Sequence, residues 1–278
     1  MAPNAVSWLL PRDEIAHQEL HRRSEAPSGR TWEHWNMLQN SRVSNPLISA
    51  RGLTRSYGTT HALDGIDVAL ELGTAVAIMG PSGSGKSTLL HALAGIELPD
   101  SGTVTLNLPG QGPIQVEQLK DAARTKLRRE AFGFVFQSGL LIPELTAEEN
   151  VAMALMINGV PRGAAIARAV DALQQLGLAG MEQRRIGQLS GGQSQRVAIA
   201  RAQVTGASVV FADEPTGALD SVTGTEVLDT LLRCTVGAGK TLVMVTHDRQ
   251  VAARCDRVLT LHDGKITADD ALVEGNRS

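Results

Sequence analysis

The sequence predicts an α/β fold, in which buried parallel strands alternate with helices. Three apolar runs have the length and composition of buried strands: residues 75–79, 208–212 and 241–245. Glycines follow the first run and an apolar-periodic segment, residues 89–93, comes next, which is typical of a strand leading into a helix. A chain of 278 residues with 42% hydrophobic residues can bury one such core and a smaller helical lobe.

The first predicted strand leads into a phosphate-binding loop. Glycines let successive backbone N–H groups face one anion at a helix N-terminus, where the helix dipole favours negative charge. We expect Lys86 to reach the β- and γ-phosphates of a nucleotide and Ser87 to offer its hydroxyl to Mg²⁺. The alternative is a loop that only turns a strand into a helix, and the Gly-x4-Gly-Lys-Ser pattern in this setting disfavours it. The loop consists of Gly80, Pro81, Ser82, Gly83, Ser84, Gly85, Lys86, Ser87 and Thr88.

Two adjacent carboxylates, Asp213 and Glu214, end the second predicted strand. Asp213 would hold Mg²⁺ through water, and Glu214 would orient and polarise the water that attacks the γ-phosphate. The alternative is that both residues only open a turn before Pro215. The phosphate-binding loop in the same chain favours the catalytic interpretation.

His247 follows the third predicted strand. The strand ends of an open α/β sheet are where such folds keep their ligands. The imidazole would therefore donate a hydrogen bond to the γ-phosphate and steady the attacking water. Taken singly, a histidine is more often a capping or packed residue, and its position after the Asp-Glu strand is what favours function.

A second anion-binding helix start lies at Leu189-Ser190-Gly191-Gly192-Gln193, because the residues that follow have the apolar spacing of a helix. Within one nucleotide-binding domain this helix start has no phosphate of its own to hold. The alternative is a flexible Ser/Gly loop that caps a helix. The specificity of the five-residue string disfavours that alternative.

Together these motifs resemble those of the ATPase subunit of ATP-binding cassette (ABC) transporters, over about residues 47–267. The resemblance implies a P-loop NTPase cassette with a RecA-like core, an antiparallel β subdomain and a small α-helical subdomain at about residues 145–190. It also implies roles for three further residues. Tyr57 would stack on adenine, Gln137 would contact Mg²⁺ or the attacking water, and Asp220 would belong to the D-loop.

In that family two cassettes face each other head to tail. The resemblance therefore implies that each ATP lies between the phosphate-binding loop of one copy and Ser190, Gly191, Gly192 and Gln193 of the other. The γ-phosphate would hold the homodimer together, and hydrolysis would let the pair open. Lys86, Gln137, Glu214 and His247 are the expected catalytic residues. Asp213, Ser87 and Gln137 are the expected metal ligands.

The stretch of residues 132–151 resembles the MacB, LolD and FtsE group, whose cassettes pair with permeases of few transmembrane helices. This implies a membrane-associated protein at the cytoplasmic face of the inner membrane, acting in export or in the transmission of force across the envelope. Leu140, Leu141, Ile142 and Pro143 are candidate permease contacts, and ordinary core packing is the alternative reading of this apolar run.

Composition is consistent with this reading. The longest apolar runs are far below the ~20 residues that span a bilayer, so the chain itself is not expected to form the pore. A net charge of −3 argues against broad nucleic-acid binding. Cys234 and Cys255 lack the close spacing of metal ligands and fit a reduced, cytosolic setting.

Residues 1–46 contain all three tryptophans and lie outside the predicted cassette. A short docking helix, a poorly ordered tail and a translation start at Met37 are all compatible with this stretch. Residues 268–278 are predicted to be a C-terminal tail.

The alternative function is a soluble ABC ATPase that acts on nucleic acid or ribosomes. Such a protein would be expected to have tandem cassettes, zinc-ligand cysteines or basic arms, and the sequence shows none of these.

Overall fold

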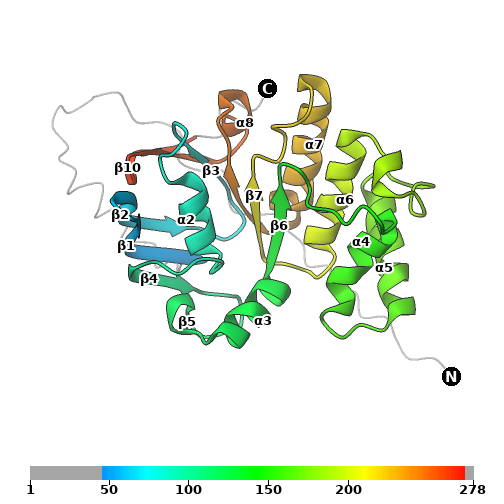
Figure 1. The fold of residues 1–278 in the computed structure, drawn as a ribbon, viewed down its shortest axis with the longest axis horizontal. Helices are drawn as coiled ribbons and strands as arrows, with labels where there is room; N and C mark the ends of the chain where they lie inside the picture. The colour runs from blue at the N-terminus through cyan, green and yellow to red at the C-terminus, as the bar shows by residue number, and fades with distance from the viewer. Residues whose placement is uncertain (1–45, 273–278) are drawn as a thin grey trace, which may run out of the picture. The chain divides into compact units, whose positions relative to one another are not determined.

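A six-stranded sheet forms the centre of the fold (Figure 1). The computed structural model describes residues 46–272. The strand order is β10-β9-β3-β8-β7-β6, and every neighbouring pair is parallel except β9 and β10. The three strands predicted from apolar runs, β3, β7 and β8, lie next to one another at the centre of this sheet. The six strands are β3 Ala75–Met79, β6 Phe132–Phe136, β7 Val209–Asp213, β8 Thr241–Val245, β9 Arg257–His262 and β10 Lys265–Ala271.

A second, antiparallel sheet has the order β2-β1-β4-β5. Along β2, Ile66, Val68 and Leu70 are buried and alternate with exposed residues, which is the period-2 pattern of a strand with one face on the core. The backbone amide of Asp64 donates to the carbonyl of Gly264 at 2.9 Å and so joins this sheet to the six-stranded one. The four strands are β1 Ile48–Tyr57, β2 Thr60–Leu70, β4 Ser101–Leu106 and β5 Ile114–Gln115.

Helices α4, α5 and α6 pack against one another beside the sheet (Figure 1). The start of α4 is defined by a capping box, in which Thr146 and Glu149 each satisfy the other's backbone amide. No helix within residues 46–272 has the length and apolar character needed to cross a membrane. The helices are α2 Lys86–Leu93, α3 Asp121–Ala131, α4 Ala147–Met156, α5 Arg162–Gln175, α6 Gly191–Gln203, α7 Ser221–Cys234 and α8 Arg249–Ala252, with 3₁₀ turns η1 Val116–Gln118, η2 Ile186–Gln188 and η3 Val236–Ala238.

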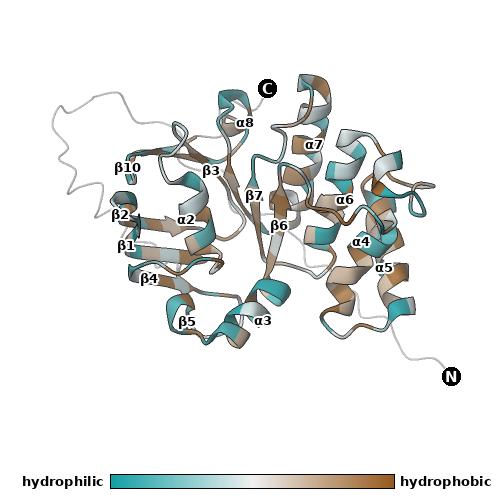
Figure 2. Ribbon diagram, viewed as in Figure 1, coloured by the Kyte–Doolittle hydropathy of each residue, from teal (hydrophilic) through white to brown (hydrophobic). Residues whose placement is uncertain are grey.

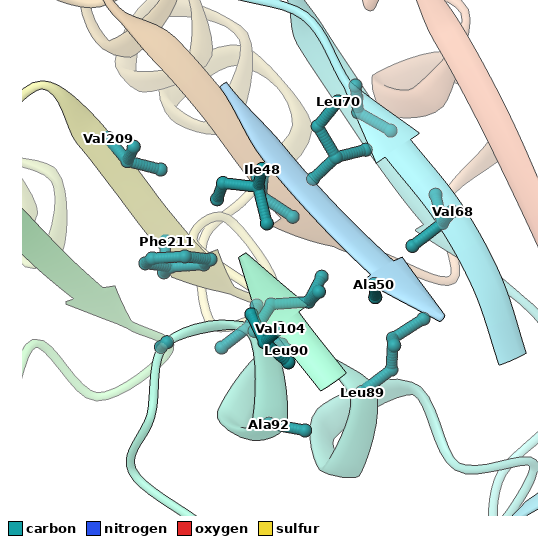
Figure 3. Close-up of a cluster of buried hydrophobic side chains, with 14 of the residues drawn as sticks. Ile48, Ala50, Val68, Leu70, Leu89, Leu90, Ala92, Val104, Val209 and Phe211 are labelled. Atoms are coloured by element: carbon teal, nitrogen blue, oxygen red, sulfur yellow. The ribbon is translucent and has the colours of Figure 1, made fainter. Parts of the chain in front are cut away.

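The apolar core lies on both faces of the six-stranded sheet. One cluster contains side chains of β1, β2 and β4 together with those of α2 and β7, and Figure 3 shows Ile48, Leu70, Leu90 and Phe211 converging there. The other cluster joins the opposite face to α4, α5, α6 and α7. In Figure 2 the central strands are hydrophobic, whereas the helices carry hydrophilic residues on their outer sides. The sheet is thus held rigidly between two apolar layers, which is what a precisely placed site requires.

One predicted boundary needs correction. Strand β10 continues to Ala271, so the C-terminal tail cannot begin at residue 268. Asp269, Asp270 and Ala271 pair with β9, and sheet pairing of this kind is not visible in local sequence. The predicted N-terminal extension lies, apart from Pro46, outside the described residues, and its interpretation stays a prediction.

Candidate nucleotide-binding site

Strand register brings the predicted site residues to one edge of the sheet. Ile78 in β3 lies beside Val245 in β8, which lies beside Asp213 in β7, which in turn lies beside Phe136 in β6. All four strands are parallel, so the residues that follow each strand emerge at the same edge. The phosphate-binding loop, Glu214, His247 and Gln137 therefore meet there, although they are far apart in the chain.

Two positions in the loop require glycine for two reasons: the backbone has a positive φ, and a neighbouring carbonyl oxygen leaves no room for a Cβ atom. Gly80 has φ of 146°, and a Cβ there would lie 2.1 Å from the carbonyl oxygen of Leu261. Gly85 has φ of 99°, and its Cβ would lie 2.0 Å from the carbonyl oxygen of Ala62. The loop is thus seated on β9 and β2, and any side chain at either position would displace it.

The loop ends in a helix start that has no side-chain cap. Gly85 is the N-cap residue of α2, and no side chain accepts from the first amides of the helix. Lys86 folds back over the loop, and its Nζ donates to the carbonyls of Gly80 at 3.0 Å and Pro81 at 2.8 Å. The buried Ser84 hydroxyl lacks a hydrogen-bond partner within the described chain. Unused donors around one glycine-rich turn are what a bound phosphate would satisfy.

An open cavity of about 370 Å³ lies over this loop. The residues that line it include six of the nine loop residues, the pair Asp213 and Glu214, and Tyr57. Sequence reasoning missed three further lining residues, since no motif marks them, and they line the cavity only because β2 and β8 pass beside the loop. The full lining is Tyr57, Thr60, Ala62, Ser82, Gly83, Gly85, Lys86, Ser87, Thr88, Asp213, Glu214 and Val245.

Glu214, which lines the cavity, forms a hydrogen-bonded pair with His247, which is not among the lining residues. The Nδ1 atom of His247 lies 2.8 Å from Oε1 of Glu214. This hydrogen bond and the charge of Glu214 raise the pKa of His247 above its ordinary value. Glu214 itself has φ of 48°, a conformation that is uncommon for a residue with a side chain and that concentrates at functional sites. Its amide donates to the Val245 carbonyl at 3.0 Å, which fixes the carboxylate beside β8.

Gln137 lies directly after β6 and next to the Asp-Glu strand end. A Cβ on Gly217 would come within 3.0 Å of the Gln137 side-chain amide nitrogen, so the two segments are in close contact. Gln137 is not among the residues that line the cavity. Gln137 therefore lies close to the turn that follows the carboxylate pair, and its contact with the metal stays a prediction.

Tyr57 lines the cavity from the antiparallel sheet, and two neighbours fix its ring. The Arg55 guanidinium lies 5.0 Å from the ring centroid, and the Tyr57 hydroxyl donates to Glu97. Arg55 is in turn held by Asp100 at 2.7 Å. The ring is thus oriented from one face and from its edge, and it is 47% exposed. Sequence reasoning identified the tyrosine and missed Glu97 and Asp100, because they come from a segment about 40 residues further along the chain.

The residues of the second helix start lie outside this cavity. Ser190 caps α6: its Oγ accepts from the Gln193 amide at 3.3 Å, and Gln193 Oε1 accepts from the Ser190 amide at 2.9 Å. A Cβ on Gly192 would lie 2.4 Å from the Thr223 side chain, so glycine here permits α6 to pack on α7. The functional expectation and the capping alternative are therefore compatible, because a serine hydroxyl that accepts one bond can still donate its proton.

Asp220 is the N-cap residue of α7. Its Oδ1 accepts from the amides of Thr223 at 3.0 Å and Val222 at 3.1 Å. The hydrogen bonds from Thr223 are the main reason that the pKa of Asp220 is lowered. The structure thus gives Asp220 a helix-capping role and places it outside the cavity, so contact with nucleotide stays a prediction that requires a second copy.

The sequence profile described as "ABC transporter" matches residues 63–217, more than half of the chain. The chain belongs to the ABC transporter family. It is 46% identical over 229 residues to the macrolide export ATP-binding/permease protein MacB of Nitrosomonas europaea. It is 44% identical over 230 residues to the lipoprotein-releasing system ATP-binding protein LolD of Legionella pneumophila. These matches cover 81% of this chain, 34% of MacB and 99% of LolD, so the chain spans about a third of the MacB relative and nearly all of LolD.

Solved structures agree with this membership. The dimeric post-hydrolysis structure of the ATP-binding cassette MJ0796, bound to ADP and Pi, matches with a TM-score of 0.72 and 37% identity. The match covers 81% of this chain and 98% of that one. Another dimeric MJ0796 structure gives 0.73 and 38%. The predicted fold class and the predicted ABC ATPase cassette of the MacB and LolD type are therefore confirmed.

Proposed function

We propose that this protein hydrolyses Mg²⁺-bound ATP as a head-to-tail homodimer and thereby drives a membrane permease. The observation that carries the proposal is the hydrogen bond between His247 and Glu214, whose carboxylate lines the cavity over the phosphate-binding loop. Oε1 of Glu214 is bound to the histidine, which leaves Oε2 to accept a hydrogen bond from the attacking water. Nε2 of His247 is left to face the γ-phosphate.

The residues present suit Mg²⁺. Ser87 and Asp213 line the same cavity and offer a hydroxyl and a carboxylate oxygen. No cluster of three acidic, histidine or cysteine side chains able to hold a metal occurs within residues 46–272. Mg²⁺ typically takes one or two protein oxygens and completes its shell with water and substrate phosphates, which agrees with so sparse a donor set. When bound, the ion would neutralise charge that develops on the phosphates.

The need for a second copy follows from where α6 begins. Ser190, Gly191 and Gly192 lie at a helix N-terminus but outside the chain's own cavity. The first amides of a helix have no intrahelical partner, so this end still has donors for an anion. A head-to-tail dimer would supply the γ-phosphate of the other copy, and the MJ0796 cassettes, to which this chain is similar, are described as dimeric.

The proposed permease would contact the segment that follows Gln137. Leu140 is 58% and Ile142 is 36% exposed, so both side chains are accessible to a partner. Leu141 packs against the core, so for this residue the core-packing alternative holds. Asn150 is fully buried and binds the amide and carbonyl of Ile142, which holds the exposed side chains in place. MacB and LolD are named as parts of export and lipoprotein-releasing systems, and a place at the cytoplasmic face of the membrane would follow from such a partner.

The test is the variant Glu214→Gln, studied by ATP turnover and by size-exclusion chromatography with light scattering. We expect turnover to fall by about 10²–10⁴-fold while ATP binding persists, because the amide cannot polarise the attacking water. Trapped ATP should then give a dimer in the presence of Mg²⁺. Adding Ser190→Arg should prevent that dimer without abolishing ATP binding, since the side chain would obstruct the partner's phosphate.

Two results would contradict the proposal. Unchanged turnover in Glu214→Gln would remove Glu214 from catalysis, and a dimer that forms equally well without nucleotide would remove ATP from the interface. A useful control is Glu226→Gln, which alters an exposed carboxylate that pairs with Arg196 at 2.7 Å outside the cavity. This control should leave both turnover and dimerisation unchanged.

A further inference from the structure

A second cavity lies at the edge of the sheet opposite the nucleotide site. Strand β8 connects the two: Val245 at its end lines the nucleotide cavity, and Lys240, directly before its start, lines the second cavity. The second cavity has a volume of about 410 Å³, which falls in the range of small-molecule pockets, ~300–1,000 Å³. Its walls come from α5, the end of α6, the end of α7 and η3. The residues are Arg168, Asp171, Ala172, Gln175, Leu176, Ala200, Gln203, Val204, Cys234, Ala238 and Lys240.

Hydrogen-bond donors in this cavity outnumber the acceptors available to them. The half-buried Lys240 donates to the neutral Oε1 of Gln203, and within residues 46–272 no carboxylate lies within ion-pair distance of it. The Nε2 amide of Gln203 is buried and has no acceptor in the described chain. Arg168 donates to the carbonyl of Val204 at 3.0 Å and likewise forms no ion pair there. A buried donor without an acceptor is costly, so the arrangement favours an occupant that brings acceptors.

The charge and apolarity of the lining residues indicate which kind of ligand would fit the cavity. Asp171 is the one acidic residue of the lining and is exposed, so Arg168 and Lys240 leave a net positive charge. Burial lowers the pKa of Lys240, which shows that its charge is incompletely solvated. The other lining is mainly apolar and comprises Ala172, Leu176, Ala200, Val204 and Ala238. A negative head and a short apolar body would match these two surfaces.

We propose that this cavity binds a small-molecule monocarboxylate with a short hydrocarbon chain. The carboxylate would accept hydrogen bonds from Lys240 Nζ and Gln203 Nε2, with Arg168 adding long-range attraction. The chain would lie against Leu176 and Ala200. Because α5, α6 and the residue directly before β8 all line the cavity, the ligand would contact both the helical part of the protein and the start of a central strand.

The cavity contains its own reporter, the thiol of Cys234. Cys234 lines the cavity, and the other cysteine, Cys255, is only 3% exposed, with burial raising its pKa to about 12. A thiol reagent should therefore modify Cys234 first. We would measure the rate of Cys234 alkylation in the full chain by mass spectrometry at increasing concentrations of octanoate, with octylamine and octanol as probes of equal chain length.

We expect octanoate to slow alkylation in a saturable manner and the amine and alcohol to have at least about tenfold weaker effects. Octylamine is protonated and has no acceptor, and octanol accepts only as a neutral oxygen, without the charge of a carboxylate. Lys240→Gln should weaken protection by about tenfold, and Gln203→Leu should also weaken it. The matched control Lys126→Gln removes an exposed lysine of α3 and should change nothing. Circular dichroism and an unchanged Cys255 alkylation rate would show that folding is intact.

Three outcomes would overturn the proposal. These are no protection by octanoate, equal protection by all three probes, or protection that is unaffected by both cavity variants. The second outcome would mean that the cavity takes apolar chains without reading charge. ATP turnover is not the readout, so this test is independent of the proposed hydrolysis mechanism.

Discussion

The two helix starts that the motifs mark, α2 and α6, are built differently. The first amides of α2 follow Gly85, which has no side chain to cap them, and they face the chain's own cavity. The first amides of α6 follow Ser190, whose side chain caps the helix reciprocally with Gln193. A helix start that always faces its own ligand needs no cap. One that meets its ligand only on dimerisation needs a cap to stay stable in the monomer.

The largest effect is expected from closing the α2 site with Gly85→Ala. The new Cβ would lie 2.0 Å from the Ala62 carbonyl oxygen at a φ of 99°, so the loop must move away from the phosphate. Strained backbone costs of about 1–3 kcal/mol correspond to a loss of nucleotide affinity of up to about 100-fold, and the clash adds to this. Affinity should be measured by titration with a fluorescent ATP analogue.

Gly110→Ala is the control for that prediction. Gly110 also has a positive φ, 75°, but nothing lies within 4 Å of its Cβ position. It should cost some stability and leave nucleotide affinity unchanged. If Gly85→Ala binds as tightly as the parent protein, the close approach of the loop to β2 is not what shapes the site.

Variants at the start of α6 should show whether Ser190 contributes only to stability or also to ATP-dependent dimerisation. Ser190→Ala removes a cap worth about 1 kcal/mol and also removes the hydroxyl proposed to meet the partner's nucleotide. In the Glu214→Gln background we expect a lower Tm and the loss of ATP-dependent dimerisation, while ATP binding by the monomer is kept. Thr146→Ala removes an equivalent capping box from α4 and should lower Tm alone. Equal dimerisation of the Ser190→Ala and Thr146→Ala variants would show that Ser190 caps the helix and does not contribute to the dimer interface.

The pH response should report the Glu214–His247 pair. The carboxylate raises the pKa of His247, so Glu214→Gln should lower that pKa toward the ordinary value, as followed by NMR titration of the imidazole. Because the pKa is raised in the folded state, the pair favours folding below the unfolded pKa of about 6.5, and this contribution is lost as pH rises through the raised value. An identical His247 titration in both proteins would mean that the pair does not form in solution.

The smallest effect is expected at the Tyr57 ring. Arg55→Ala removes a cation–π contact at a partly exposed site, worth about 0.5–1 kcal/mol, and should raise the KM for ATP by about two- to fivefold with kcat retained. Arg254→Ala breaks a comparable surface pair with Asp229 and is the control. A fall in kcat instead of a rise in KM would show that Arg55 acts on more than the orientation of the ring.

Local motifs carried most of the inference about the fold and the site. The loop from Gly80 to Thr88, the Asp213–Glu214 pair and the string from Ser190 to Gln193 each contain their chemistry within a few residues. Apolar runs before them indicated the central strands for the same reason. The end of β10 was missed because its pairing partner, β9, stabilises a segment that is largely exposed and has no apolar pattern of its own.

The sequence by itself determined which residues are chemically equipped to bind and hydrolyse a nucleotide, because those residues lie in short contiguous motifs. Only the tertiary structure decided how they meet: the 2.8 Å contact of Glu214 with His247, the hydrogen bond of Tyr57 to Glu97, and the second cavity around Lys240. These features join segments that lie tens of residues apart in the sequence. Their geometry is set by strand register and core packing, which are non-local and leave no local pattern to read.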